Sequence, residues 1–262
     1  MVASKIRGTH GLLDLLKQPV LSVQEFLVLS GKAIRNVIRR PHYADDIFLQ
    51  MDIIGVGSLP IVILTGFFTG AVMALQMSKA LSQYGAVGKT GELVTISIVR
   101  ELGPVLTSLM VAGRNSSGMA SELGSMKVTE QIDAMRALGT DPIQKLVTPR
   151  LIATCTVLPL LTIIADFLGM FGGFLIALAL LKMTPAQYWN SAWQAIVYSD
   201  IFQGLLKPFV YAFIVALVGC HFGMQTTGGT QGVGRSTTRA VVVASVWIFV
   251  LDFFITRFFV NL

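Results

Sequence analysis

The chain has 262 residues, of which 53% are hydrophobic and only 13% are charged. Soluble domains carry about 25% charged residues, so this sequence has too little polar surface to cover a water-soluble globule of its length. The formal net charge of +6 fits cytoplasmic loops enriched in Lys and Arg, and we predict no nucleic-acid partner.

The hydropathy pattern predicts membrane-spanning helices. A helix needs about 20 apolar residues to cross a bilayer. Five segments are long and apolar enough, at residues 53–78, 93–113, 151–181, 201–224 and 240–260. The predicted fold is therefore an all-α integral membrane bundle of five transmembrane helices.

An amphipathic segment precedes the first span. One helical face carries Phe26, Leu29, Ala33 and Val37, and the opposite face carries Lys32, Arg35, Asn36 and Arg39. This pattern is typical of an elbow helix that lies in the membrane interface. We predict one domain over residues 1–262, with a cytoplasmic or interfacial segment at 1–45 and the bundle at 46–262.

Basic residues predict the orientation. Fourteen of them lie in the N-terminal segment and in the loops after spans two and four, against four in the opposite loops and at the C-terminal end. By the positive-inside rule the N-terminus lies in the cytoplasm. Five spans then place the C-terminus on the other side.

Glycine pairs predict close helix contacts. Gly66 and Gly70 are spaced by four residues in the first span, and Gly169, Gly172 and Gly173 gather in the third. Small residues at this spacing let helices approach closely in lipid.

The loop between spans two and three, residues 114–150, contains a second amphipathic pattern. Val128, Ile132, Met135 and Leu138 form an apolar stripe, and the opposite side is charged. A glycine at 139 and an Asp-Pro pair at 141–142 end the helix. Such a helix either rests on the bilayer or docks into a groove of a cytoplasmic partner, and its mixed charge favours the partner.

Ionisable residues inside spans are costly and usually functional. Counted at about 1.5 Å per residue, Arg100, Glu101, Lys207 and Asp252 all fall in the outer half of the bilayer. We predict that they form a shared polar cluster, which either pairs across a dimer or lines a pocket open to the outside. The alternative is a buried ion pair that only fixes helix register. Asp166 lies at the same depth and is the candidate for a structural role.

The sequence contains no complete catalytic motif. Residues 229–236 approach a phosphate-binding loop but carry Arg235 where that loop needs Lys, and we interpret them as a flexible connection. His10, His42 and His221 lie far apart in the sequence and indicate no metal site. We predict a non-catalytic chain without a cofactor, whose energy comes from a partner.

Several ordered motifs resemble the MlaE-type permease family. They are VRELGPVL at 99–106, AGR at 112–114, ASELG at 120–124, TEQIDA at 129–134, DP at 141–142 and STTR at 236–239. The resemblance extends over nearly the whole chain from the elbow helix onward.

This resemblance implies the permease of an ABC transporter in the bacterial inner membrane. It implies a homodimer, a cytoplasmic ABC ATPase, a periplasmic MCE-domain protein and, in many members, a small cytoplasmic STAS-domain protein. The cargo in Gram-negative members is phospholipid, moved between the inner membrane and the MCE partner so that outer-membrane lipid asymmetry is maintained. The implied ATPase-coupling residues are Glu130, Gln131, Asp133, Met135 and Arg136.

The resemblance also implies a lipid-binding site. It assigns the predicted charged cluster to that site and adds an apolar stripe at the outer end of the first span. The implied lipid-binding residues are Met73, Met77, Leu81, Tyr84, Arg100, Glu101, Lys207 and Asp252. From the residues alone, a stripe such as that from Met73 to Tyr84 is more often ordinary helix packing.

Two other classes of function stay open. A secondary transporter or channel would couple to ions through Glu101, Asp166 and Asp252, although the five spans show no inverted repeat. A structural scaffold would only join partners on the two sides of the membrane.

Overall fold

The computed structural model describes the backbone of residues 3–41 and 43–260, and side chains from residue 20 to residue 259 apart from 42. All regular structure in these residues is helical, as predicted. Five helical segments are long and apolar enough to cross a membrane, which confirms the predicted number of spans. They are Ala44–Ser82, Val87–Val128, Ile143–Ala179, Tyr198–Met224 and Gly229–Phe259.

The second span consists of three α-helices joined by π-helical turns. Its helices are α3 (Thr90–Ser97), α4 (Gly103–Val111) and α5 (Ser117–Val128). The turns are η2 (Ile98–Leu102) and η3 (Ala112–Ser116), and a short 3₁₀ turn η1 (Val87–Lys89) precedes α3.

The sequence prediction ended this span at residue 113, which is too early. The helix continues to Val128 because its polar residues find partners on neighbouring helices. The Arg114 guanidinium donates to the Ser58 hydroxyl at 3.1 Å, and the Ser116 hydroxyl donates to the Val215 carbonyl at 2.6 Å. Arg114 therefore belongs to a helix and not to the following loop.

Glycine contacts join α2 (Ala44–Ser82) and α7 (Thr148–Ala179) along their lengths. A Cβ atom built on Gly70 would lie 1.7 Å from the Gly169 carbonyl oxygen, and one on Gly172 would lie 2.1 Å from the Phe67 carbonyl oxygen. The two backbones thus touch, as the predicted small-residue pairs require.

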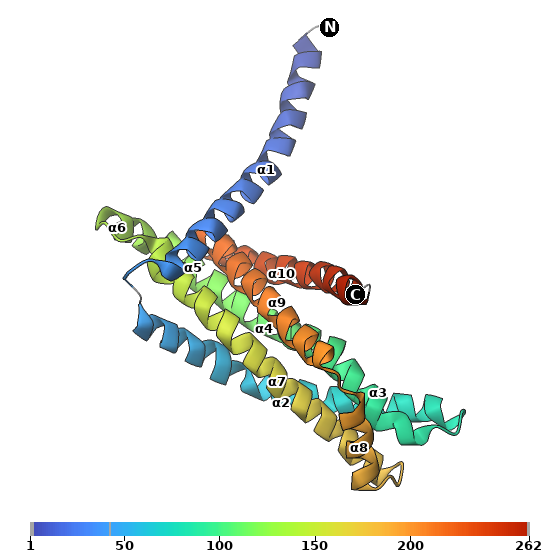
Figure 1. The fold of residues 1–262 in the computed structure, drawn as a ribbon. Coiled ribbons are helices and arrows are strands. Elements are labelled where there is room, and N and C mark those ends of the chain that lie inside the picture. The colour runs from blue at the N-terminus through green and yellow to red at the C-terminus, as the bar shows by residue number, and fades with distance from the viewer. Residues whose placement is uncertain (1–2, 42, 261–262) are drawn as a thin grey trace.

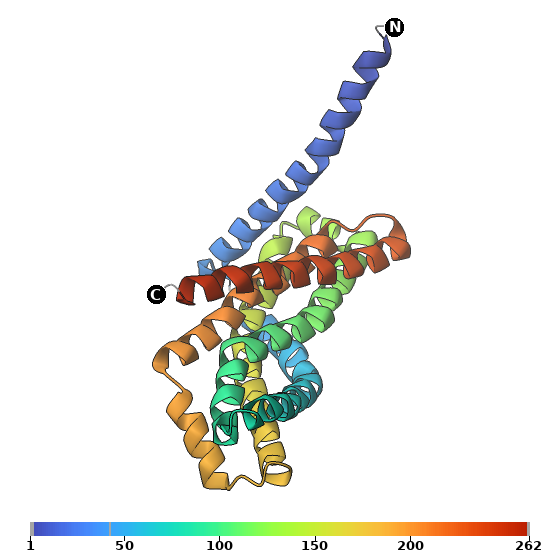
Figure 2. The same ribbon diagram turned by 90° about the vertical axis from the view of Figure 1, so that its right-hand side faces the viewer.

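Helix α1 (Ala3–Ile38) leaves the bundle at an angle, and its N-terminal end lies far from the other helices (Figures 1 and 2). Leu29 and Ala33, which were predicted on the apolar face, are buried against the bundle. Asn36 was predicted on the polar face and is instead buried, and its amide donates to an Asp141 carboxylate oxygen at 3.4 Å. Positions 29, 33 and 36 follow helical spacing, so Asn36 continues the buried face.

Two short helices mark the ends of the bundle (Figure 1). The predicted loop helix is α6 (Gln131–Ala137), followed by the π-helical turn η4 (Ile143–Val147). At the opposite end lies α8 (Pro185–Ala195), which was not predicted. A capping box starts α8, because the Thr184 hydroxyl accepts from the Gln187 amide and the Gln187 side chain accepts from the Thr184 amide.

The last two spans are α9 (Tyr198–Met224) and α10 (Gly229–Val260), which lie side by side. The interpretation of residues 229–236 as a flexible connection is wrong, because these residues form the first turns of α10. Gly228 and Gly229 have φ values of +85° and +68°, which glycine adopts readily, so the reversal between the spans is confined to a few residues.

A Gly70→Ala substitution should lower thermal stability, because the added methyl group would overlap the Gly169 backbone and push α7 away from α2. We expect a loss of about 1–3 kcal/mol, typical of overpacking, measured as a lower midpoint of thermal unfolding in detergent. Gly118→Ala is the matched control, because nothing lies within 4 Å of a Cβ at Gly118. Equal midpoints for the two variants would contradict the contact.

Candidate functional site

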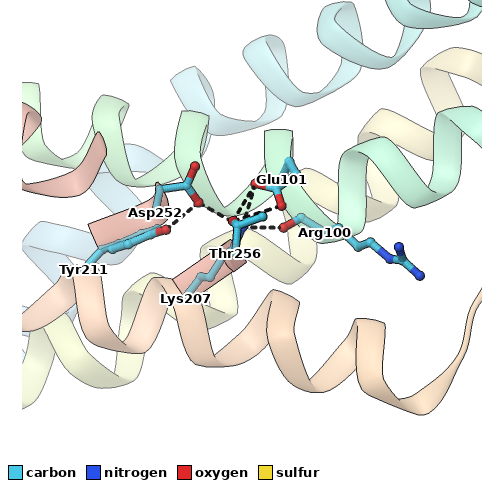
Figure 3. A network of polar contacts seen from close by, with 6 residues as sticks. All are labelled: Arg100, Glu101, Lys207, Tyr211, Asp252 and Thr256. Carbon is cyan, nitrogen blue, oxygen red and sulfur yellow. Dashed lines mark hydrogen bonds and ion pairs between the residues drawn. The ribbon is translucent and has the colours of Figure 1, made fainter. Parts of the chain in front are cut away.

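A buried lysine forms the centre of the candidate site (Figure 3). Lys207 on α9 is completely buried, and its ammonium lies 2.6 Å from a Glu101 carboxylate oxygen and 2.8 Å from an Asp252 carboxylate oxygen. It also lies 2.8 Å from the Thr256 hydroxyl and 3.0 Å from the backbone carbonyl oxygen of Arg100. The cluster therefore joins three membrane helices around one positive charge.

Local backbone structure brings Glu101 and Lys207 together. Glu101 lies in the π-helical turn η2, and Pro104 follows in the first turn of α4. Proline has no N–H, so the carbonyl oxygen of Arg100, four residues before Pro104, lacks its usual intrahelical donor. The Lys207 ammonium donates to this oxygen instead. Gly204 lies one turn before Lys207, and a Cβ at Gly204 would lie 2.6 Å from the Val99 carbonyl oxygen. This glycine lets α9 approach η2 closely.

Two further polar side chains complete the cluster, and the sequence analysis missed both. The Tyr211 hydroxyl donates to an Asp252 carboxylate oxygen at 2.8 Å, and the Thr256 hydroxyl lies 3.2 Å from a Glu101 carboxylate oxygen. Tyr211 follows Lys207 by four residues, and Thr256 follows Asp252 by four. That spacing places each of them on the same helix face as a charged residue of the cluster, and it was the available signal.

The Arg100 side chain does not join the cluster, which corrects the predicted four-residue arrangement. Figure 3 shows it pointing away from Lys207. Its guanidinium forms an ion pair of 2.7 Å with Asp200, whose other carboxylate oxygen accepts from the Val197 amide at the start of α9. Asp200, a lone acidic residue at the beginning of the fourth span, was also missed.

The two carboxyl groups of the cluster are accessible from one side. The side chains of Glu101 and Asp252 are 37% and 21% exposed, whereas that of Lys207 is fully buried. They line an open groove of about 340 Å³. Its lining residues are Glu101, Phe249, Asp252, Phe253, Thr256 and Arg257.

The groove combines opposite charges with an apolar wall. Glu101 and Asp252 outnumber Lys207 among the formal charges of the cluster, so the groove offers acceptors for a cationic group, while Arg257 at the same groove offers a donor for an anion. Phe249 and Phe253 supply aromatic surface. This arrangement suits an amphiphilic ligand whose head carries charge.

The remaining predicted lipid-binding residues lie elsewhere in this single chain. Met73, Met77 and Leu81 are half-buried, Tyr84 is 82% exposed, and none of the four lines the groove. Met73 packs against Ala74, Val94 and Ile98, between α2 and the second span. The structure thus places this stripe apart from the charged cluster.

Asp166 is separate from the cluster as well. It lies on α7 beside Gly103, where a Cβ atom would approach its Oδ1 to 1.6 Å. This Oδ1 atom is buried and has no hydrogen-bond partner among the described residues. Asp166 therefore belongs to the contact between α4 and α7.

The predicted coupling residues lie in and just before α6. Glu130 directly precedes the helix, at its N-cap, with φ of +60°, and Glu130 and Gln131 are exposed. Asp133 pairs with Lys127 at 2.7 Å and with Arg136 at 2.9 Å. The hydrogen bond from Lys127 is the main cause that lowers the pKa of the Asp133 carboxyl below its usual value.

The predicted apolar stripe of this helix is divided. Ile132 is fully buried against the bundle, whereas Met135 is half-buried and Leu138 is 83% exposed. Ile132 therefore anchors α6. Met135, Leu138 and the exposed Val128 at the end of α5 are the apolar side chains of the stripe that remain for a partner.

Within residues 3–41 and 43–260, no group of three or more His, Cys, Asp or Glu side chains is arranged to hold a metal ion. His221 packs edge-on against Phe26 and Phe222. His42 and the side chain of His10 lie outside the described residues.

The five spans and the buried charged cluster define a multi-pass membrane protein, and comparison with known sequences identifies its class as a permease. The family model described as Permease MlaE matches residues 47–258. A probable ABC transporter permease protein of Rickettsia conorii is 42% identical over 91% of this chain and 92% of its own length.

Two further relatives come from other organisms. The intermembrane phospholipid transport system permease protein MlaE of Haemophilus influenzae is 35% identical over 79% of this chain and 80% of its own length. The chloroplastic protein TRIGALACTOSYLDIACYLGLYCEROL 1 of Arabidopsis thaliana is 36% identical over 88% of this chain and 66% of its own length. The chain belongs to the MlaE permease family.

Lys207→Met should destabilise the bundle, because it removes the one cation that both carboxylates share. Breaking a buried ion pair costs about 3–5 kcal/mol, and we expect the lower end, because Glu101 and Asp252 also reach the groove. Tyr211→Phe, which removes one hydrogen bond, should cost about 1 kcal/mol. Thermal unfolding of both variants in detergent tests this order, and a Lys207→Met variant as stable as Tyr211→Phe would contradict it.

Proposed function

We propose that this protein is the membrane subunit of an ABC transporter that moves phospholipid between the bacterial inner membrane and a periplasmic MCE-domain partner. In Gram-negative cells this activity would maintain outer-membrane lipid asymmetry. The observation that carries the proposal is the groove over Glu101 and Asp252, which is open, charged and lined by phenylalanine. The printed name of the Haemophilus influenzae relative, a phospholipid transport permease, supports this cargo.

The groove matches the chemistry of a phospholipid head. Arg257 suits the phosphate, because guanidinium groups bind phosphate through paired hydrogen bonds. The exposed oxygens of Glu101 and Asp252 suit a cationic amine, and Phe249 and Phe253 suit the beginning of the acyl chains. In our proposal Lys207 holds both carboxylates in place from behind and does not itself contact the lipid.

A homodimer would complete this site. The groove is open on the side of α10, where Val246, Phe249 and Phe253 are exposed. A second copy packed there would enclose the groove. In our proposal the predicted stripe on α2 stays the candidate wall for the acyl chains. Its residues are Met73, Met77, Leu81 and Tyr84.

The proposed partners occupy opposite ends of the bundle. The exposed residues of the α6 region would dock a cytoplasmic ABC ATPase, which would supply the energy. A STAS-domain protein would be a further cytoplasmic partner. The N-terminus would then be cytoplasmic and the C-terminus periplasmic. This orientation rests on the distribution of Lys and Arg between the loops.

Mass spectrometry of the protein purified from native membranes in mild detergent tests the whole proposal. We expect an ATPase subunit, an MCE-domain protein and phospholipid to co-purify. A protein that is reproducibly alone across several detergents would instead favour a secondary transporter.

Glu101→Gln should reduce phospholipid transfer without releasing the ATPase, because it removes a charge in the groove and leaves α6 unchanged. A hydrogen bond to a charged group contributes about 1.5–3 kcal/mol, so we expect about a tenfold or larger fall in transfer of a labelled phospholipid by the reconstituted complex. Glu92→Gln on α3 is the matched control, because Glu92 pairs with the exposed Lys89 outside the groove. Unchanged transfer in Glu101→Gln would refute the assignment.

Glu130→Lys should weaken recovery of the ATPase with the permease, because it reverses an exposed charge at the start of α6. Glu130→Gln is the control, since both variants keep a side chain at the same positive φ and differ in charge. We expect clearly less ATPase bound per permease with Lys than with Gln, measured by quantitative gel after affinity purification. Equal recovery from both variants would show that this charge does not contribute to docking.

A further inference from the structure

Helix α8 presents three different faces. Tyr188 and Ala192 are buried against the bundle. Trp189 and Trp193 lie next to this buried face when the residues are placed at 100° intervals. The third face is neutral and polar, and consists of Gln187, Asn190 and Gln194, all of which are exposed.

The tryptophan face belongs to a continuous aromatic series that begins on a membrane span. On α7 the Phe171 and Phe174 rings lie 6.1 Å apart, and Phe174 lies 5.5 Å from the Trp189 ring. Trp189 stacks on Trp193 at 6.4 Å with 29° between the ring planes. Phe171 is 37% exposed and Trp193 is 66% exposed, so the series runs from the surface of α7 onto the surface of α8.

We propose that α8 lies in the interfacial layer of the bilayer at its end of the bundle, with Trp189 and Trp193 inserted among the lipid headgroups. Tryptophan prefers this depth because its ring is apolar and its N–H needs a polar partner. The proposal concerns a lipid surface and holds for either orientation of the chain.

Two observations favour lipid over a protein as the occupant of this face. First, the aromatic series is continuous with the exposed apolar side of α7, where Ile163, Phe167 and Leu175 are exposed as lipid-facing residues would be. Second, α8 contains no charged residue. Charged groups fix the register of a docked protein and are common at the polar rim of protein interfaces. Helix α8 offers no such group to a protein partner.

Anchoring α8 would also set the depth of the second span. The Glu92 amide of α3 donates to the Ser191 hydroxyl at 2.9 Å, and a Cβ on Gly91 would lie 2.6 Å from the Tyr188 carbonyl oxygen. Helix α3 therefore lies directly against α8, and it continues into the turn that holds Glu101. A lipid-anchored α8 would hold that turn at a fixed distance from the headgroup layer.

Tryptophan fluorescence tests the proposal, because the chain has three tryptophans and two of them lie on α8. The full-length Trp189→Phe/Trp247→Phe variant leaves Trp193 as the only fluorophore. After reconstitution into phosphatidylcholine vesicles, we compare quenching by lipids brominated near the headgroup, by lipids brominated near the chain ends and by iodide in the water. We expect about a twofold larger loss of fluorescence with the shallow bromines than with the deep ones, and little loss with iodide.

The matched control is Trp189→Phe/Trp193→Phe, which leaves Trp247 near the middle of the α10 span and should respond more to the deep bromines. The variant that keeps only Trp189 gives an independent measurement and should respond as Trp193 does. Strong quenching of Trp193 by iodide with no response to either brominated lipid would overturn the proposal in favour of a water-exposed face. Protection of Trp193 from all three quenchers would overturn it in favour of a protein contact.

Discussion

The burial of one positive charge constrains the arrangement of the membrane helices. An ammonium group in a low-dielectric interior costs several kcal/mol unless it is paired and fully hydrogen-bonded. Lys207 meets this condition only where Glu101, Asp252, Thr256 and the Arg100 carbonyl meet around it. The register of α9 against η2 and α10 is therefore fixed by a single side chain, and any other register would leave that charge unpaired.

The same arrangement makes the cluster accessible from one side. Lys207 is sealed inside the bundle, while the two acids are partly exposed and reach the groove. A carboxylate held by a buried cation keeps its position while its outer oxygen remains available to a ligand. Such an arrangement is preorganised, because the ligand would not have to order the groups that bind it.

Much of the fold could be predicted from the sequence, because the length of an apolar run and the cost of a buried charge are strong signals. Depth counted along the helices placed Glu101, Lys207 and Asp252 at one level, and the structure brings these three together. The same estimate of depth wrongly placed the Arg100 side chain in the cluster, because adjacent residues on a helix point about 100° apart. Arg100 and Glu101 could not both face Lys207, and depth alone does not show which one does.

Two other features were missed for related reasons. The polar residues near 114–117 interrupt the hydropathy signal, although Arg114 and Ser116 have partners on α2 and α9. Helix α8 is too short to span a membrane and has no charged face, so neither the length criterion nor the charge pattern indicated it. Both depend on contacts between segments that are distant in the chain.

The π-helical turns of the second span have a consequence for how this sequence tolerates insertions and deletions. A π-helical turn holds one residue more than the α-helical turn it replaces. Deleting one residue from η2 would therefore restore a regular helix and leave α3 and α4 in their present rotation, whereas deleting one residue from α3 or α4 would rotate everything on one side of the deletion by about 100° relative to the other. The effect of a deletion within residues 98–102 would fall on the turn itself, where Glu101 would lose its present position against Lys207. The π-helical turns are thus the places where this span could change its length by one residue and keep the faces of its helices.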